Sequence, residues 1–420
     1  MGASPGDDQD GSGGPGADAV LADAGTTEAG DAAKPAAARA GGRGRLPGLD
    51  GIRGVAALFV LVHHCRLLAF PGYPADTGPG WLSWLIYGHF AVVVFIVLSG
   101  FSLAVSPARS GWRLGGVRRF ARRRAWRILP PYWAALVFSL VVAWTLVPQP
   151  GEGVPTAKSV LVYGLLLHDV LGAPSPNGAF WSIAVEAQLY LVFPLLLLVL
   201  RRAGAFVMLA AVTAVVVAVG LLASVSHPVS LLLRLTPQFA ALFAAGVVAA
   251  GVLAAGERVR RFPWHRVAAL ACVPVLALVV ARGPVWTVEH YYWVDLALGP
   301  AVALLLAGVA TGRPAALVRL LDTRPVRSLG SFSYTLYLVH APIVVAIHRL
   351  VVAPHVPGGV PAFLVTLAVA GPVSLVAARS FAAVFELPFQ RHRGWPALRE
   401  AMRGRLSRAR AALRPAPERP

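Results

Sequence analysis

One arginine and one histidine stand inside an apolar stretch near the start of the chain. The stretch reads LDGIRGVAALFVLVHH, with Arg53 and His64 eleven positions apart. In an α-helix, eleven steps of 100° bring the second side chain to within about 20° of the first, roughly 16 Å further along the axis. An ionised side chain in hydrocarbon costs about 3 kcal/mol or more and is normally kept there for function. The pair predicts a proton acceptor, His64, and a cation, Arg53, that holds an anion near one membrane surface.

Two neighbours and a structural alternative belong to this interpretation. Asp50 lies three residues before Arg53 and can pair with it, whereas His63 is rotated by about 100° from His64 and lies off the stripe. In the structural alternative, Arg53 extends to the membrane interface and His64 hydrogen-bonds to a neighbouring helix. Two ionisable residues on one intramembrane stripe favour a functional role over this alternative.

The segment WSIAVEAQLY carries a second set of polar residues. Ser182, Glu186 and Tyr190 follow one another at four-residue steps, so they share one helix face. The carboxylate of Glu186 can orient His64 or bind a sugar hydroxyl, and Trp181 offers a stacking surface for a sugar ring. An interfacial aromatic belt that includes one glutamate is the structural alternative.

A third polar stripe lies in the segment GSFSYTLYLVH. Ser333, Tyr337 and His340 fall at positions i, i+4 and i+7 of a helix that is otherwise apolar. The stripe makes Tyr337 and His340 candidate substrate contacts. Hydrogen bonding between helices explains it equally well, since such bonds are common in membrane bundles.

Six arginines precede the third apolar run within ten residues. They are Arg118, Arg119, Arg122, Arg123, Arg124 and Arg127. On a helix such side chains can clamp the phosphates of a cytoplasmic nucleotide-like donor, which makes Arg123, Arg124 and Arg127 candidate donor ligands. Membrane topology and attraction to anionic lipid headgroups also explain the run, and taken alone the run favours that account. Arg127 stands apart because it opens a span directly before Pro130 and Pro131.

The composition is that of a polytopic membrane protein. Of 420 residues, 57% are hydrophobic and 14% are charged, and the mean hydropathy is +0.66. The net charge of +19 does not indicate a nucleic-acid partner, because the basic residues lie between the apolar runs, where membrane topology places them. Cys65 and Cys272 lie in apolar segments and offer no disulfide framework. The sequence shows no metal-ligand spacing, phosphate-binding loop or GxSxG turn, so we expect no metal cofactor.

The apolar runs predict an all-α integral membrane protein with about ten spans. The spans cover roughly residues 50–70, 82–104, 131–148, 183–200, 205–223, 236–254, 266–281, 292–311, 331–350 and 361–385. Segment 159–170 is too short to cross and is predicted to be a re-entrant or surface piece on the outside. We expect a transmembrane domain over 46–390. Residues 1–45 are rich in Gly, Ala, Pro and Asp and predict a disordered tail, and 391–420 form a basic tail.

The basic residues predict the orientation. One set of loops and both termini hold 31 Lys and Arg residues, against about five on the opposite side. Both termini are therefore expected in the cytoplasm. Arg53 then lies near the cytoplasmic mouth of the first span, His64 and Glu186 lie in the outer half, and His340 lies about 15 Å from the cytoplasmic end. Polar groups at these depths suit a route between two compartments.

Six sequence pieces occur in a fixed order from about Leu49 to Phe389. They read LDGIRGVAALFVLVHH, FIVLSGF, RILPPYW, WSIAVEAQLY, GSFSYTLYLVH and ELPF. Together with the ten spans and their orientation, they resemble the membrane-bound acyltransferase 3 family. One departure is AVVV before FIVLSGF, which is apolar where many relatives carry a polar residue.

The resemblance implies an O-acyltransferase of the plasma or inner membrane. Members of the family move an acyl group, usually acetyl, from cytoplasmic acyl-CoA to a hydroxyl of a sugar, a cell-surface glycan or a small molecule such as a macrolide. The family's arginine and histidine pair corresponds to Arg53 and His64, its third-span arginine to Arg127, and its WSxxVE glutamate to Glu186. We therefore expect His64 to be the general base, and Glu186 to position His64 or the acceptor. Arg53 and Arg127 are expected to bind the donor or to orient its thioester, with His64, Arg53 and Glu186 as the catalytic residues.

A transporter of a small solute is the main alternative, because polar residues at several depths also suit a permeation route. The sequence shows no inverted repeat and no clearly broken helix pair, which argues against it. A non-catalytic scaffold would not explain why Arg53 and His64 lie in an apolar segment. The chain ends about thirty residues after the last span, without the extracytoplasmic hydrolase-like domain that some polysaccharide-modifying relatives carry. We therefore expect a small acceptor or a separate extracytoplasmic partner.

Overall fold

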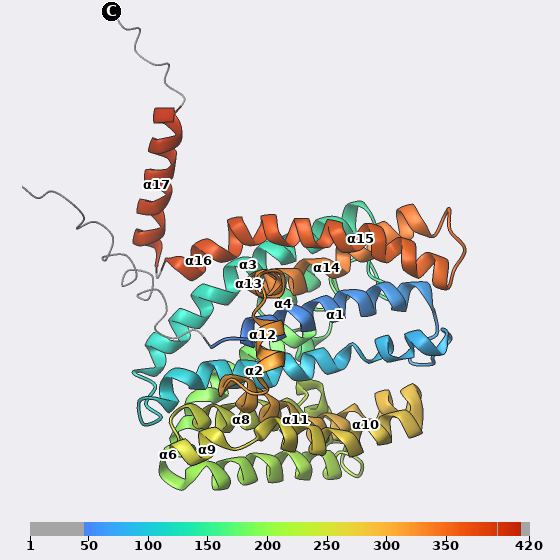
Figure 1. Cartoon of the computed structure of the whole chain (residues 1–420). Helices are drawn as coiled ribbons and strands as arrows, with labels where there is room; N and C mark the ends of the chain where they lie inside the picture. The colour runs from blue at the N-terminus through green and yellow to red at the C-terminus, as the bar shows by residue number, and fades with distance from the viewer. Residues whose placement is uncertain (1–45, 393, 413–420) are drawn as a thin grey trace, which may run out of the picture. The chain divides into compact units, whose positions relative to one another are not determined.

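A computed structural model describes residues 46–392 and 394–412 of the chain. Within these residues the regular secondary structure is entirely helical, as predicted (Figure 1). The predicted tail over 1–45 lies outside the described residues. The described residues of the predicted basic tail include helix α17 (Trp395–Ala412).

The longest helices form the body of the bundle. They are α1 (Leu49–Ala69), α2 (His89–Ala108), α3 (Val117–Thr145), α6 (Trp181–Leu222), α8 (Gln238–Ala249), α10 (Trp264–Glu289), α11 (Tyr291–Ala310), α14 (Ser333–Ile347) and α15 (Val360–Phe381). Shorter helices connect them. These are η2 (Gly80–Tyr87), α4 (Ala157–Gly164), α5 (His168–Leu171), α7 (His227–Ser230), η3 (Leu231–Leu235), η4 (Ala250–Leu253), α9 (Glu257–Arg261), α12 (Ala315–Leu321), α13 (Arg324–Ser331), η5 (His348–Val352), η6 (Ala382–Glu386) and α16 (Leu387–Arg391).

Eight helices of the described part are long and apolar enough to span a membrane, or nine if one bent pair counts as a span. Helix α6 has 42 residues, about 63 Å, which is twice the roughly 30 Å hydrocarbon core of a bilayer. Gly204 interrupts it with a φ of 87°. Both ends of α6 approach the start of α11, because Trp181 and Tyr291 stack on His89 while the Tyr292 hydroxyl bonds to the carbonyl of Val216. Helix α6 is therefore a hairpin that holds two of the predicted spans.

One expectation from the sequence is wrong. The segment His227–Leu235 and the segment Gln238–Leu253 meet at a bend of 47°, so the chain does contain a broken helix pair. Thr236 lies at the break in a left-handed conformation, with φ 46° and ψ 56°. The apolar segment 159–170 forms only the short helices α4 and α5 and no spanning helix, as predicted.

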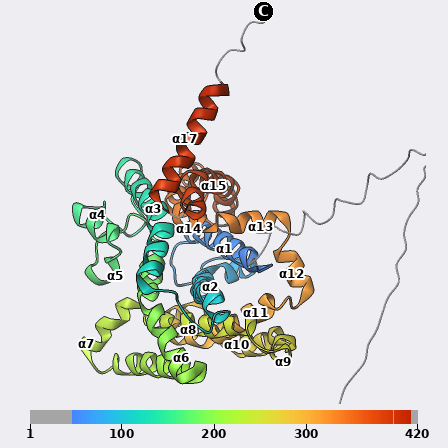
Figure 2. The same cartoon turned by 90° about the vertical axis from the view of Figure 1, so that its left-hand side faces the viewer.

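The buried side chains form two clusters, one that includes α2 and one that includes α1. One cluster joins α2, α6, α8 and α11, and the other joins α1, α3, α14 and α15. Figure 2 shows these helices from one end. Helices α2 and α8 pack closely because Gly100 faces the backbone of Phe243 and Gly246 faces the backbone of Val97, where a Cβ atom would lie 2.2 and 2.0 Å from a carbonyl oxygen. Small residues allow such approach between membrane helices.

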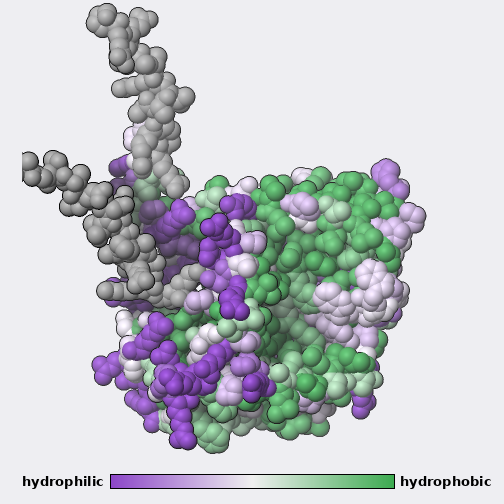
Figure 3. Space-filling view, viewed as in Figure 1, coloured by the Kyte–Doolittle hydropathy of each residue, from purple (hydrophilic) through white to green (hydrophobic). Residues whose placement is uncertain are grey.

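Polar residues gather at one end of the bundle. Figure 3 shows hydrophilic residues at the end where α9, α12 and α13 lie and an apolar surface over the middle. We call this the basic end, because it carries the arginines of 109–127, 258–266 and 313–327. The opposite end, where loop 70–88 joins α1 to α2, is called the far end. The apolar middle agrees with a multi-pass membrane protein.

Candidate active site

Helix α1 carries Arg53 and His64 toward opposite ends of the bundle. The helix is continuous from Leu49 to Ala69, so the two residues lie roughly 16 Å apart along it. At the basic end, Arg53 Nη1 lies 3.1 Å from Asp50 Oδ1 and Nη2 lies 2.6 Å from the hydroxyl of Ser102 on α2. The predicted pairing of Asp50 with Arg53 is therefore confirmed. The contacts with Asp50 and Ser102 together hold the guanidinium of Arg53 between α1 and α2.

A cavity of about 380 Å³ opens around Arg53. Its charged lining residues are Asp50, Arg53, Arg124, Arg127, Glu186 and Glu386, and its hydroxyl-bearing lining residues are Ser99, Ser102, Ser182, Tyr190, Ser331, Ser333, Tyr334 and Tyr337. The volume lies in the range of small-molecule pockets. Three guanidinium groups around one cavity offer several donors for phosphate or carboxylate oxygens.

Glu186 belongs to this cavity. Its carboxylate accepts hydrogen bonds from the hydroxyl of Ser99, at 2.7 Å, and from the hydroxyl of Tyr190. The predicted helix face shared by Ser182, Glu186 and Tyr190 is confirmed, since all three line the cavity. Glu186 forms no hydrogen bond with His64 within the described residues, because His64 Nδ1 faces Val60 of α1 and His340 of α14. The role of Glu186 toward His64 or the acceptor stays a prediction.

His64 pairs with His340 of α14. His64 Nδ1 lies 2.8 Å from the carbonyl oxygen of Val60 and 3.3 Å from His340 Nε2, and His340 Nδ1 lies 2.9 Å from the carbonyl of Tyr337. Carbonyl partners assign the proton of each ring to Nδ1. His340 Nε2 then accepts from His64, and the Nε2 lone pair of His64 stays available as a base.

Tyr337 lies between the cavity and the histidine pair. Its ring centroid is 5.9 Å from that of His340 and 5.5 Å from that of Phe95, and its hydroxyl is 2.7 Å from the hydroxyl of Ser182. Tyr337 and Ser182 line the cavity, whereas His64 and His340 do not. One aromatic side chain therefore separates the wall of the arginine cavity from the histidine pair.

Two candidates from the sequence lie elsewhere. The ring of Trp181 stacks on that of His89, with centroids 5.8 Å apart, and is tilted against Phe239 at 5.9 Å. Trp181 therefore packs against protein groups and does not line the cavity. Arg123 is exposed on α3, and only Arg124 and Arg127 of the arginine run reach the cavity lining.

Sequence reasoning did not single out Glu386 as a cavity residue. Glu386 is buried at the end of η6, accepts a hydrogen bond from Thr335 and lies 2.7 Å from Gln390 Nε2. The motif ELPF contained the signal, since a carboxylate within an apolar membrane segment indicates function. Asp295 of α11 was missed in the same way; it is fully buried, 2.9 Å from His89 Nε2.

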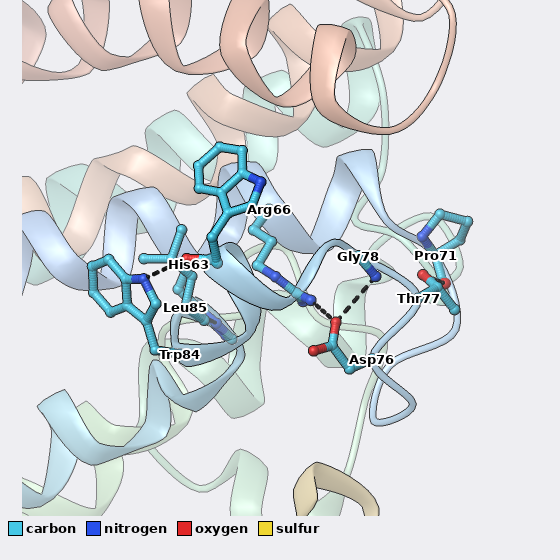
Figure 4. A network of polar contacts seen from close by, with 9 residues as sticks. His63, Arg66, Pro71, Asp76, Thr77, Gly78, Trp84 and Leu85 are labelled. Carbon is cyan, nitrogen blue, oxygen red and sulfur yellow. Dashed lines mark hydrogen bonds and ion pairs between the residues drawn. The ribbon is translucent and has the colours of Figure 1, made fainter.

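The far end of α1 is held by its own polar network, drawn in Figure 4. Buried Arg66 forms an ion pair with Asp76, whose carboxylate also accepts the backbone N–H of Gly78 at 3.1 Å. His63 Nδ1 lies 2.7 Å from the carbonyl oxygen of Leu85. His63 thus supports the loop. Within the described residues, no group of three or more His, Cys, Asp or Glu side chains could hold a metal ion.

Comparison with known proteins decides the family. Residues 46–379 match the family model described as an acyltransferase domain, Acyl_transf_3. The chain belongs to the acyltransferase 3 family. No solved structure matches this chain.

Named relatives are distant in sequence. The chain is 23% identical to "Peptidoglycan O-acetyltransferase OatA" of Listeria monocytogenes over 71% of this chain and 49% of OatA. It is 28% identical to "Acyltransferase MdmB" of Streptomyces mycarofaciens over 73% of this chain and 81% of MdmB. This acyltransferase 3 protein therefore spans about half the length of OatA and most of the length of MdmB.

Proposed function

We propose that this acyltransferase 3 protein moves an acetyl group from cytoplasmic acetyl-CoA to a hydroxyl of a sugar, glycan or small-molecule acceptor such as a macrolide. In this proposal residues 46–390 are the catalytic domain in the plasma or inner membrane, between two cytoplasmic tails. The observation that carries it is the cavity at the basic end, which places Arg53, Arg124 and Arg127 around one space. The names of OatA and MdmB support the reaction class.

In the proposed donor site, the arginines bind the phosphates of the thioester substrate. Arg53 is fixed by Asp50 and Ser102, so its charge needs little reorganisation when a phosphate arrives. Arg124 and Arg127 lie one helical turn apart on α3 and face the same cavity. The long flexible arm of coenzyme A would carry the thioester from these arginines past Tyr337 toward the histidine pair.

In the proposed transfer step, His64 Nε2 removes the proton from the acceptor hydroxyl as its oxygen attacks the thioester carbonyl. A C–O bond forms, the C–S bond breaks, and the thiolate of coenzyme A leaves and takes up the Nε2 proton of His64. Before this last proton transfer, His64 carries a proton on both nitrogens, and its Nδ1–H points at Val60 and His340 Nε2. His340 is a positioning residue that stabilises this charged form.

The test is a transfer assay with membranes that contain the full-length chain. Acetyl-labelled acetyl-CoA is supplied with a cell-envelope and metabolite extract, and mass spectrometry identifies labelled products. The proposal predicts an acetyl ester that forms with the wild type and is lost in His64→Ala. If folded wild-type protein consumes none of several short-chain acyl-CoA donors, the proposal is wrong.

A second candidate is a carrier of a small solute. The broken helix pair at Thr236 favours it, since discontinuous helices often form substrate sites in transporters. Uptake into proteoliposomes without acyl-CoA would support the carrier, because an acyltransferase need not move a solute. The arginine cavity and the family assignment support the enzyme more directly.

A further inference from the structure

A second polar cluster lies where α2, α8 and α11 meet near the far end. His89 Nε2 lies 3.0 and 2.9 Å from the two carboxylate oxygens of Asp295, and Gln238 Nε2 lies 3.5 Å from Asp295 Oδ2. Asp295 is fully buried and Gln238 is 6% exposed. None of these residues lines the arginine cavity. A buried carboxylate in a membrane helix normally marks a functional site.

Two buried polar atoms, one in this cluster and one two residues before it in the chain, have no partner within the described residues. They are Gln238 Oε1 and Thr236 Oγ1. Leaving a buried hydrogen-bonding group unpaired costs about 1–3 kcal/mol, so such atoms are rare without a ligand or water that pairs with them. An amide flip of Gln238 does not give Oε1 a partner, because Oε1 would then face the carboxylate of Asp295.

The backbone beside these atoms is strained. Thr236 adopts φ 46° and ψ 56°, a left-handed conformation that is unfavourable for a β-branched residue. Thr236 lies two residues before Gln238, the first residue of α8. Strained residues and interrupted helices concentrate at binding sites, where the surrounding structure maintains them. Strain and unpaired atoms thus occur together within three residues of the chain.

Aromatic contacts connect the cluster with the proposed base. The ring of His89 stacks on Tyr291 with centroids 3.9 Å apart, and the Tyr291 hydroxyl lies 3.4 Å from that of Tyr73. The ring of Tyr73 lies 6.4 Å from His63, which lies 5.2 Å from His64. The exposed side chain of Tyr73 brings this path to the surface at the far end.

We propose that Thr236, Gln238 and the His89–Asp295 pair bind hydroxyl groups of the acceptor at the far end of the bundle. This inference rests on the proposed function, since it places the hydroxylated substrate of that reaction. Gln238 Oε1 accepts an O–H, and Thr236 Oγ1 accepts or donates. His89, oriented through Nε2 by Asp295, offers Nδ1. Sugar hydroxyls both donate and accept, so two hydroxyls of one ring satisfy the unpaired atoms.

The test uses full-length protein in lipid nanodiscs with acetyl-CoA and two probes, the disaccharide N-acetylglucosaminyl-N-acetylmuramic acid and a glycosylated macrolide. Thr236→Gly removes the hydroxyl and relieves the left-handed strain, so its unfolding temperature should not fall. Its KM for the active probe should rise about tenfold, the loss expected for one hydrogen bond. Gln238→Leu should act in the same direction, and Gln188→Leu on α6 is the matched control.

Hydrogen exchange gives a readout that does not need turnover. Saturating probe should protect amides of residues 236–242 in the wild type and not in Thr236→Gly. Protection without any acetyl transfer would support the site and contradict the proposed function. Transfer with an unchanged KM in Thr236→Gly and Gln238→Leu, and no protection of 236–242, would overturn the inference and leave buried water as the partner of these atoms.

Discussion

The two ends of α1 differ in how their charges are arranged. At the basic end, Arg53 shares a cavity with two further arginines and three carboxylates. Toward the far end, His64 lies beside His340, and within the described residues no carboxylate hydrogen-bonds to either ring. Fixed cations suit the binding of phosphates, whereas a neutral imidazole suits proton transfer. Under the proposed function, donor binding and base catalysis are therefore separable properties of one helix.

The largest expected effect comes from His64→Ala. Loss of a general base lowers rates by about 10²–10⁴-fold, so acetyl transfer should fall by about a thousandfold. The KM for acetyl-CoA should change little, because the arginine cavity does not include His64. Steady-state kinetics with labelled acetyl-CoA measure both values.

The neighbouring ring supplies the control for this prediction. His63→Gln removes an imidazole that bonds to the carbonyl of Leu85 and supports the loop at the far end. It should lower the unfolding temperature, but it should reduce the rate of transfer far less than His64→Ala does. Equal losses of rate in His63→Gln and His64→Ala would contradict the assignment of His64, and not His63, as the base.

Arg127→Gln tests the arginine cavity at the basic end, to which α3 contributes Arg127. Removal of one charge-assisted contact to phosphate should raise the KM for acetyl-CoA about 10- to 100-fold, and saturating donor should recover most of the rate. Arg119→Gln is the matched control, since Arg119 is exposed on the same helix and does not line the cavity. If both variants raise the KM equally, the arginine run acts through its overall charge and the cavity is not the donor site.

His340 tests whether the imidazole pair acts as a unit. His340→Leu removes the acceptor that faces His64 Nδ1 and should lower kcat about tenfold, while both KM values stay nearly constant. His340→Asn retains an acceptor oxygen and should recover part of kcat. A structural role alone would give equal losses in the two variants, with lowered thermal stability.

The smallest effect concerns the segment between α3 and α6, outside the spanning helices. The His168 ring stacks on Tyr163 with centroids 4.1 Å apart, and burial lowers the pKa of His168 to about 4 from 6.5. The unfolded chain therefore takes up this proton as the pH falls from 6.5 to 4, and stability is lost. Burial raises the pKa of Asp169 to about 6, which acts in the opposite sense.

His168→Phe removes only the first of these effects. On lowering the pH from 7 to 5, its unfolding temperature should fall less than that of the wild type, by a few degrees at most. Thermal unfolding of purified protein at the two pH values measures this difference. Equal shifts in both proteins would show that His168 does not titrate with unfolding.

The helices were predictable because each spanning helix needs about twenty apolar residues, a local property of the sequence. The shared helix face of Arg53 and His64 was also predictable, since it depends only on the helical repeat, which is another local property. The hairpin at Gly204 was also anticipated as two spans. The break at Thr236 was missed, because a single residue in a left-handed conformation leaves little trace in hydropathy.

Partners from distant helices were harder to predict. His89 meets Asp295 across 206 residues, and His64 meets His340 across 276. Glu186 lines the cavity, but the periodicity of α6 does not predict its partner Ser99 on α2. The aromatic stack of Trp181 likewise depends on packing between helices. Helical periodicity places a side chain on a face, whereas only the packed bundle decides what that face meets.

The most direct test of the account is the sidedness of transfer in oriented vesicles. Acetyl-CoA is sealed on the side of the basic end, and the disaccharide or macrolide acceptor is supplied on the other side. The account predicts an acetylated acceptor on the far side. This product should be absent with His64→Ala. With Arg127→Gln, excess acetyl-CoA should restore it. Product that forms only when donor and acceptor share one side would contradict a route along α1 between the arginine cavity and His64.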